Sequence, residues 1–376
     1  MSSPLRELGR LGQSLWYDNI HRGLLRSGEL ARMVREDGIV GVTSNPTIFD
    51  KAIAEGGEYD EQILALAAQG QSVEESYEAL VTEDIRQAAD VLRPVYEATA
   101  GRDGYVSLEV SPELAYDAEA TVEAVRRLWR LLDRPNVMVK IPGTRQGLPA
   151  IQRCLTEGMN INVTLLFSVR RYEEVVEAYI RALEERSRQG LPLDGVASVA
   201  SFFVSRVDTL VDRLLEERAR EAGPAAEEAA SLLGRAAVAN AKLAYERFQA
   251  LYAGERFRAL AARGARPQRL LWASTSTKDP RYSDVKYVEE LIGPDTVNTV
   301  PQVTLDAFRD HGRVAPTLTA GLEEAKEVIA RLARLGIDME AVAQELEWQG
   351  VELFAESYRR TLVSLAEKRA RLLAAT

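Results

Sequence analysis

The stretch NVMVKIPGT, residues 136–144, is typical of a buried strand, yet it carries one charged side chain. Alternate side chains of a strand point to opposite faces of the sheet. Val137 and Val139 therefore share one face, and Lys140 shares the other with Met138. A lysine seldom accepts burial without a partner. We expect Lys140 to face an interior lined by polar residues of other strands, unless it is a solvated residue at a strand edge.

Short apolar runs of the same kind recur along the chain and are followed by turn residues. The other predicted strands are QSLWYDNI (13–20), GIVGVTSNP (38–46), YVSLEVS (105–111), NINVTLLFS (160–168), GVASVASFFVSR (195–206), RLLWASTS (269–276) and DTVNTVPQV (295–303). Segments with helical period, such as 117–133 and 168–187, separate most of them. Eight strands alternating with helices predict an α/β fold, a (β/α)8 TIM barrel. Periodicity alone leaves a doubly wound open sheet as the alternative.

Two helical regions exceed a minimal barrel. Residues 209–266 predict two or three extra helices between strands six and seven, broken at the Gly-Pro pair 223–224. The tail, 317–376, predicts C-terminal helices with breaks at Gly336 and Gly350, because glycine disfavours a helix interior. Since no linker or internal repeat is present, we expect the whole chain, 1 to 376, to form one domain.

Composition narrows the possible partners. The net charge of −10 argues against nucleic acid or an anionic membrane as the main partner, yet it permits an anionic small substrate. Cys154 is the only cysteine, and with two histidines a zinc site of cysteines and histidines is not expected. We interpret Cys154 as an inert core thiol. The chain begins without a signal peptide and has no run of about 18 apolar residues, so a cytoplasmic protein is expected.

Polar residues occupy one parity of several predicted strands. In the fifth strand the polar set is Asn160, Asn162, Thr164 and Ser168, and in the third it is Ser107 and Glu109. The opposite parity is apolar and would pack on the helices. A polar barrel interior is costly unless its groups bond one another or a ligand. The parity therefore predicts a ligand site, near the strand ends where barrel enzymes place theirs.

The residue types at these positions suit the chemistry of a Schiff base. An amine in a partly apolar pocket is favoured in its neutral form, which attacks ketones, and the resulting iminium accepts electrons when the adjacent carbon–carbon bond breaks. Such an enzyme needs a base, a carboxylic acid that shuttles protons, and amides or hydroxyls that hold a polyol. Asp18, Glu109, Asn45, Asn162 and Thr164 match these needs.

Each of these residues also has a purely structural interpretation. Asp18 suits a helix cap, Glu109 a buried ion-pair partner, and Thr164 a core hydroxyl bonded to backbone. The pair Asn45-Pro46 is a common turn signal. Their joint presence on separate strands favours one shared cavity over independent structural roles.

Seven segments, in order between about residues 16 and 312, resemble the transaldolase family, and STSTKDP within the last of them resembles its longer bacterial branch. They are WYDN, GVTSNPTIF, VSLEVSPELAYD, VMVKIPGT, GMNINVTLLFS, SFFVSRVD and the segment from WASTSTKDP to TVNTVPQVTLDAF. The resemblance implies a (β/α)8 barrel of the class I aldolase superfamily, with the reactive lysine on the fourth strand.

The resemblance also implies catalytic roles for four residues. Lys140 in VMVKIPGT matches the lysine that forms the Schiff base, and Asp18 in WYDN matches the base that deprotonates the C4 hydroxyl of the substrate. Glu109 in SLEV and Thr164 in NVTLLFS match the pair that positions a water for proton relay.

Substrate-binding roles follow in the same way. The groups that hold the dihydroxyacetone fragment are matched by Asn45, Asn162 and Ser201, and Phe203 matches an aromatic wall. Arg206 in FFVSR matches a phosphate-binding arginine, and its guanidinium suits that ligand.

The chain departs from the shorter transaldolases after the seventh strand, where it has ASTSTKDP in place of a second phosphate-binding arginine. Lys278 is the natural replacement, with Ser274 and Ser276 as further donors. A solvated loop lysine is the alternative interpretation of Lys278.

The resemblance implies transfer of a dihydroxyacetone unit from sedoheptulose 7-phosphate or fructose 6-phosphate to glyceraldehyde 3-phosphate or erythrose 4-phosphate. This reaction belongs to the non-oxidative pentose phosphate pathway and requires no metal or organic cofactor. An aldolase that releases free dihydroxyacetone is the nearest alternative, and a non-catalytic barrel that binds sugar phosphates is another. Acidic helical faces leave a homodimer possible.

Overall fold

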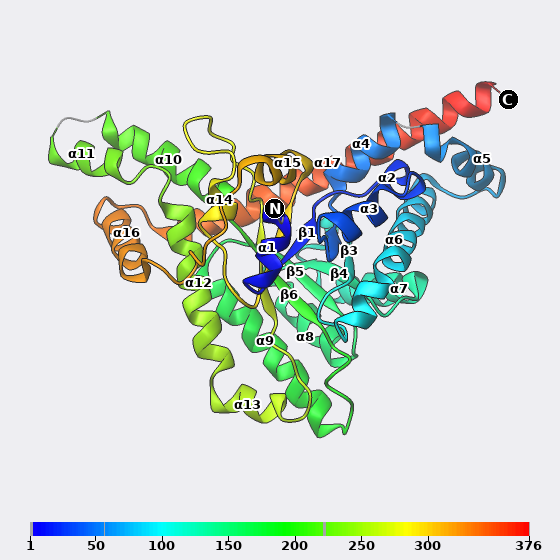
Figure 1. Cartoon of the computed structure of the whole chain (residues 1–376). Coiled ribbons are helices and arrows are strands. Elements are labelled where there is room, and N and C mark those ends of the chain that lie inside the picture. The colour runs from blue at the N-terminus through cyan, green and yellow to red at the C-terminus, as the bar shows by residue number, and fades with distance from the viewer. Residues whose placement is uncertain (1–2, 56, 221–222, 376) are drawn as a thin grey trace.

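A computed structural model describes residues 3–55, 57–220 and 223–375 and contains eight parallel strands closed into a barrel in chain order (Figure 1). The strands are β1 (Gln13–Tyr17), β2 (Gly41–Thr43), β3 (Tyr105–Glu109), β4 (Val137–Pro142), β5 (Ile161–Leu166), β6 (Ser198–Phe203), β7 (Arg269–Ala273) and β8 (Thr296–Val300). The predicted (β/α)8 barrel and all eight predicted strands are confirmed. The open sheet is excluded, because β1 pairs with β8 as well as with β2.

Helices surround the barrel, as Figure 1 shows. Those that precede β6 are α1 (Pro4–Arg10), α2 (Arg22–Arg26), α3 (Glu29–Glu36), α4 (Pro46–Glu55), α5 (Asp60–Ala68), α6 (Val73–Ala98), α7 (Ala118–Leu132), α8 (Leu148–Thr156) and α9 (Val169–Arg188), with short 3₁₀ turns η1 (Gly57–Tyr59) and η2 (Pro112–Leu114). The apolar side chains on the outer face of the strands pack under these helices. Among them, Val137, Val139, Ile161 and Val163 are all fully buried. Cys154 of α8 is also fully buried, and burial raises the pKa of its thiol to about 12, as expected of an inert core thiol.

Two polar residues of the predicted interior set serve the scaffold instead. Asn160 lies just before β5, where its side chain donates to the carbonyls of Pro135 and Val137 and so joins neighbouring strand ends. Ser168 caps α9, because its Oγ accepts a hydrogen bond from the backbone N–H of Arg171 at 3.0 Å. The parity prediction was wrong for these two because they lie outside β5, where strand alternation no longer applies.

The region between β6 and β7 is larger than predicted. It contains α10 (Ser205–Ala219), α11 (Pro224–Ser231), α12 (Ala236–Tyr252) and α13 (Glu255–Ala261). Because α10 begins at Ser205, Arg206 lies in a helix and not at the end of the predicted sixth strand. Gly223 precedes α11, in agreement with the predicted break.

The C-terminal region ends in one long helix. It follows α14 (Lys286–Glu289), α15 (Gln302–His311) and α16 (Leu322–Arg334), and α17 (Met339–Ala375) then runs for 37 residues across one end of the barrel (Figure 1). Gly336 separates α16 from α17 as predicted, but the break predicted at Gly350 was wrong. A Cβ atom at Gly350 would lie 2.8 Å from a methyl group of Leu165 in β5. Glycine is therefore present inside α17 because the helix passes so close to the strand.

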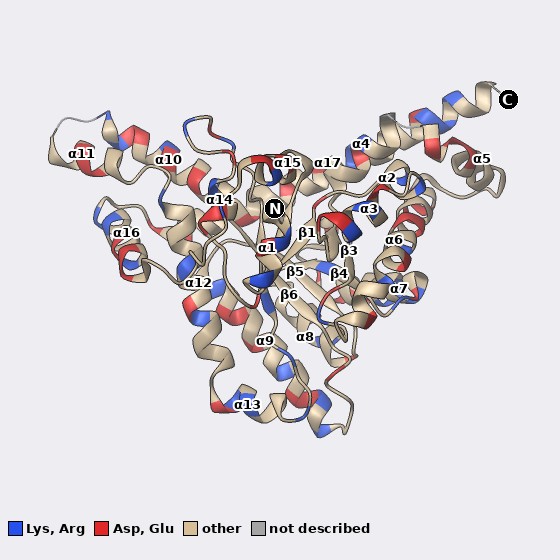
Figure 2. Ribbon diagram, viewed as in Figure 1, with Lys and Arg blue, Asp and Glu red and all other residues tan. Residues whose placement is uncertain are grey.

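Charges of both signs alternate over the outer helices (Figure 2). Of the helices formed by residues 3–55, 57–220 and 223–375, none is both long and apolar enough to cross a membrane.

Candidate active site

Three predicted site residues lie side by side because their strands are in register. Glu109 of β3 is paired with Lys140 of β4, and Lys140 is paired with Asn162 of β5. Equal register places their side chains on one face, the barrel interior. The Lys140 Nζ lies 3.3 Å from the Glu109 Oε1 and donates a hydrogen bond of 2.9 Å to the Ser44 carbonyl. The side chains of Lys140 and Glu109 are only 6% and 5% exposed.

Asp18 directly follows β1, and its backbone N–H donates to the Val300 carbonyl of β8 at 2.8 Å. Its Oδ1 accepts a hydrogen bond of 2.7 Å from the Thr43 hydroxyl, which in turn lies 2.6 Å from the Thr299 hydroxyl. Burial raises the pKa of Asp18 above its usual value, while the hydrogen bond from Thr43 and the charge of Lys140 partly oppose this rise. The carboxyl is thus suited to exchange protons.

A cavity of about 180 Å³ opens at the carboxyl ends of the strands. Of the predicted residues it is lined by Asp18, Asn45, Lys140, Thr164, Ser201, Phe203, Arg206 and Lys278. It continues into a wider mouth of about 780 Å³, again lined by Asp18, Asn45, Arg206 and Lys278. Side chains from the loop after β1, the β2–α4 turn, β4, β5, β6, α10 and the loop after β7 therefore converge on this cavity. Glu109 and Asn162 were predicted to share it but do not line it, and Glu109 lines a neighbouring cavity together with Asn45.

Asn162 lies beneath this cavity in a chain of hydrogen bonds. Its Oδ1 accepts from the Ser201 hydroxyl at 2.7 Å, and its Nδ2 donates to the Ser107 hydroxyl at 3.1 Å. These bonds fix the orientation of the amide. Asn45 has two roles, because its Oδ1 accepts from the Ile48 N–H at the start of α4 while the residue lines the cavity. The interpretation of Asn45 as a turn residue is correct for the local structure and incomplete for the site.

Several buried polar atoms around the cavity have no hydrogen-bond partner among the described residues. They are both carboxyl oxygens of Glu109, the Thr164 hydroxyl and the Arg206 Nη1. Buried polar atoms are rarely left without a partner, so these three side chains are available to a ligand or to water. Burial also raises the pKa of Glu109, against the opposing charge of Lys140, which favours a carboxyl that can donate a proton.

Two cations lie at one end of the cavity. The Arg206 guanidinium stands 5.5 Å from the ring centre of Phe203 and 5.9 Å from that of Phe354. The Lys278 Nζ donates a hydrogen bond of 2.6 Å to the Ser276 hydroxyl. Burial lowers the pKa of both groups, and the charge of Arg206 lowers that of Lys278 further. Arg206 is half-buried, whereas Lys278 is exposed, as its interpretation as a solvated loop lysine expects. Two neighbouring cations at this end of the cavity nevertheless favour an anionic ligand.

The predicted set lacked five residues that line this cavity, namely Thr43, Ala273, Thr299, Pro301 and Phe354. Thr43 and Thr299 lie at the ends of β2 and β8, and Phe354 belongs to α17. Thr43 lies two residues before Asn45, so the strand parity was a signal for it. Phe354 had no local signal, because only the path of α17 across the barrel brings it to Arg206.

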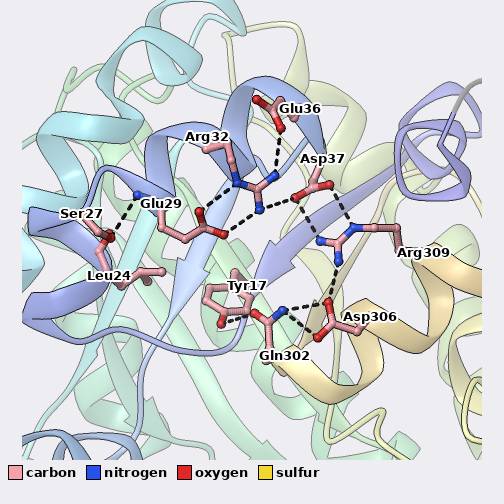
Figure 3. A network of polar contacts seen from close by, with 10 residues as sticks. All are labelled: Tyr17, Leu24, Ser27, Glu29, Arg32, Glu36, Asp37, Gln302, Asp306 and Arg309. Atoms are coloured by element: carbon pink, nitrogen blue, oxygen red, sulfur yellow. Dashed lines mark hydrogen bonds and ion pairs between the residues drawn. The ribbon is translucent and has the colours of Figure 1, made fainter.

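A polar network supports the end of β1 from outside, as Figure 3 shows. Tyr17, which precedes Asp18, donates its hydroxyl to the Gln302 side chain of α15 at 2.7 Å. Gln302 donates to Asp306, and Arg309 joins Asp306 to Asp37. The network therefore ties β1, α3 and α15 together next to the Asp18 carboxyl. In the described part of the chain no group of histidine, cysteine, aspartate or glutamate side chains is arranged to hold a metal ion.

Comparison with known proteins identifies the family. The family model described as transaldolase/fructose-6-phosphate aldolase matches residues 15–365. A transaldolase of Thiobacillus denitrificans is 51% identical over 96% of this chain and 99% of its own length. Transaldolases of Thermobifida fusca and Frankia alni are 50% and 49% identical, each over 98% of this chain and over 99% and 98% of their own lengths. The chain therefore belongs to the transaldolase/fructose-6-phosphate aldolase family, as a transferase of the transaldolase type.

Proposed function

We propose that Lys140 forms a Schiff base with the C2 carbonyl of a ketose phosphate and that the enzyme transfers the resulting dihydroxyacetone unit. The observation that carries this proposal is the buried Lys140 amine, which lines a cavity together with Asp18 and lies 3.3 Å from the Glu109 carboxylate. The amine attacks C2, and Glu109 donates the proton that lets water leave the carbinolamine. The products of this step are the iminium and one water molecule.

Asp18 and the iminium then share the bond-breaking step. The Asp18 carboxylate takes the proton of the C4 hydroxyl, the C3–C4 bond breaks, and its electron pair moves into the iminium to form an enamine. An aldose phosphate leaves. The enamine attacks the aldehyde of the acceptor, Asp18 returns its proton to the new hydroxyl, and hydrolysis frees Lys140. We assign sedoheptulose 7-phosphate and fructose 6-phosphate as donors, and glyceraldehyde 3-phosphate and erythrose 4-phosphate as acceptors, in the non-oxidative pentose phosphate pathway.

The remaining side chains hold the substrate and the water. Thr164, whose hydroxyl has no partner among the described residues, would position a water with Glu109. The hydroxyls of the bound fragment would be held by Asn45, Asn162 and Ser201, beside the wall formed by Phe203. The phosphate would bind between Arg206 and Lys278, which line both the cavity and its mouth, whereas Lys51 lines the mouth but not the cavity.

Trapping tests the covalent step. Incubation with fructose 6-phosphate followed by borohydride should attach a three-carbon unit to Lys140, identified by mass spectrometry of peptides. Lys140→Met, which has a similar length without the amine, should take up no label and serves as the matched control. A label on another lysine would refute the Schiff-base assignment.

An aldolase that releases dihydroxyacetone would use nearly the same residues, and the family description includes such enzymes. The two activities differ in the fate of the enamine when no acceptor is present. A transaldolase should stop after about one equivalent of aldose phosphate per site. Continued release of free dihydroxyacetone from fructose 6-phosphate alone would favour the aldolase.

A further inference from the structure

The helices between β6 and β7 are joined to the loop that carries Lys278. We call residues 274–285, between β7 and α14, the Lys278 loop. Four residues of α10, at positions 205, 208, 212 and 216, contact this loop or the start of α14. Their spacing of three, four and four residues places them on one face of the helix. Lys278 therefore lies between two attachment points, with Ser274 before it and Tyr282 after it both bonded to α10.

The contacts extend over the length of α10. They join the hydroxyls of Ser205 and Ser274 at 2.8 Å, Asp208 and Tyr287 at 2.9 Å, Asp212 and Tyr282 at 2.7 Å, and Glu216 and Arg281 at 2.7 Å. The last pair is exposed and contributes little, because solvent screens surface ion pairs. The two aspartate–tyrosine bonds are the strong part of the connection, since Asp208 and Asp212 are only 1% and 5% exposed.

Each of these aspartates binds two segments at once. In Asp208, Oδ1 accepts from the Ala237 N–H at 2.7 Å and Oδ2 accepts from Tyr287. In Asp212, Oδ1 accepts from the Gly234 N–H at 2.8 Å and Oδ2 accepts from Tyr282. Asp212 therefore joins the α11–α12 junction to the Lys278 loop, and Asp208 joins the start of α12 to α14, which follows that loop.

Gly234 shows that this junction is shaped around the ring of Tyr282. Its φ is +69°, a left-handed conformation that favours glycine. A Cβ atom at this position would lie 2.6 Å from the Tyr282 Cζ. Any larger residue would strain the backbone and push the tyrosine away from Asp212.

The charges at the mouth explain why such support matters. Arg206 is in the first turn of α10, and its charge acts unfavourably on Lys278. Without an anion between them, the two like charges repel, and ordering the loop that carries Lys278 costs entropy. We propose that the α10 face and the α11–α12 junction are a positioning device that holds Lys278 at a set distance from Arg206, ready for the phosphate of the substrate. This inference rests on the proposed function, which assigns the phosphate to these two cations.

Tyr282→Phe tests the device because it removes one hydroxyl and keeps the ring. We expect the KM for fructose 6-phosphate to rise about 5-fold, the effect of one hydrogen bond of about 1 kcal/mol, with kcat nearly unchanged. Activity with unphosphorylated fructose as donor should not change, since it has no phosphate to place. Tyr245→Phe is the matched control: it loses a hydroxyl bond of 3.0 Å to the Pro294 carbonyl, outside the loop, and should leave both donors unaffected.

Gly234→Ala is a second variant that acts on the same contact from the opposite side. It should reduce the preference for fructose 6-phosphate over fructose by more than Tyr282→Phe does. Equal losses on both donors, or an unchanged KM for fructose 6-phosphate in both variants, would overturn the positioning role. Lys278→Ala separates the two proposals. If Lys278→Ala lowers the preference for fructose 6-phosphate over fructose and Tyr282→Phe does not, only the positioning role is refuted. If Lys278→Ala leaves this preference unchanged, the assignment of the phosphate to Lys278 is itself refuted.

Discussion

Two buried ion pairs lie at opposite ends of the barrel strands, and they differ in their surroundings. At the amino ends of the strands, the Arg269 Nη2 lies 2.9 Å from the Asp103 Oδ1, with side chains 9% and 8% exposed. At the carboxyl ends, the Lys140 Nζ lies 3.3 Å from the Glu109 Oε1, with side chains 6% and 5% exposed. The two pairs are thus buried to a similar extent, but they differ in the hydrogen bonds that their carboxylates accept.

The Arg269–Asp103 pair is enclosed by further bonds. Asp103 accepts from the Ser14 hydroxyl at 2.8 Å and from the Trp16 indole at 3.3 Å, and Arg269 donates to Ser14 and to the Arg102 carbonyl. Glu109, by contrast, accepts no hydrogen bond from the described residues. A buried carboxylate that is bonded on several sides is part of the scaffold, whereas one without such bonds keeps its oxygens available for a substrate. The amino ends of the strands therefore hold a pair built for stability, whereas the carboxyl ends hold the proposed chemistry, as in other barrels of this kind.

The largest effect should come from the pair at the carboxyl end. Lys140→Met removes the proposed nucleophile, so we expect kcat to fall on the order of 10⁴-fold or more. The fold should persist, because Glu109 is then free to take up a proton and stay neutral. A coupled assay and a thermal unfolding curve measure the two quantities. Substantial residual turnover would contradict the separation of roles.

The matching change at the amino end should have the reverse result. Arg269→Met leaves Asp103 buried without its cation, so the free energy of unfolding should fall by about 3–5 kcal/mol. The kcat of the folded enzyme should remain close to that of the wild type. Urea unfolding and active-site titration by trapping check both parts. A loss of kcat per active site with normal stability would show that the two ends are coupled.

A smaller effect is expected on the pH dependence of kcat/KM, through the pKa of Asp18 at the carboxyl ends of the strands. Asp18 must be deprotonated to act as a base, and burial already raises its pKa, which the bond from Thr43 partly opposes. Thr43→Val removes that bond, so the pKa should rise further, and less of the base form should exist at low pH. The acid limb of kcat/KM should move upward by about one pH unit. Thr275→Val, which also loses a buried hydroxyl bond, should leave the limb in place.

The smallest effect is expected where α17 meets the site. Phe354→Leu keeps an apolar side chain and removes the aromatic face beside Arg206, an interaction of about 0.5–1 kcal/mol. The KM for fructose 6-phosphate should rise about 3-fold, with kcat unchanged. Steady-state kinetics test this, with Leu353→Ala as an exposed control on the same helix. A fall in kcat instead would assign Phe354 to the chemical step.

Local sequence patterns were sufficient to predict the positions of the strands and of most residues that line the cavity. All eight strands were predicted because short apolar runs end in turn residues, and parity placed Lys140, Glu109 and Asn162 on one face, which the strand register confirms. The ends of the helices and the contacts between distant segments were harder to predict from the sequence. The predictions that Gly350 ends a helix and that Arg206 belongs to a strand were wrong, because tertiary packing overrides local propensity.

The sequence alone determined which residue types lie on which face of each strand, because alternation is a property of the extended backbone. It also carried the ordered motifs of the family. The path of α17 across the barrel, which brings Phe354 to Arg206, followed from the tertiary structure alone. The same is true of the hydrogen bonds that join α10 to the Lys278 loop. The tertiary structure alone also decided that Asp103 is enclosed by bonds while Glu109 is not. The physical reason is that burial, hydrogen-bond satisfaction and charge separation depend on distances between segments far apart in the chain, which no local pattern records.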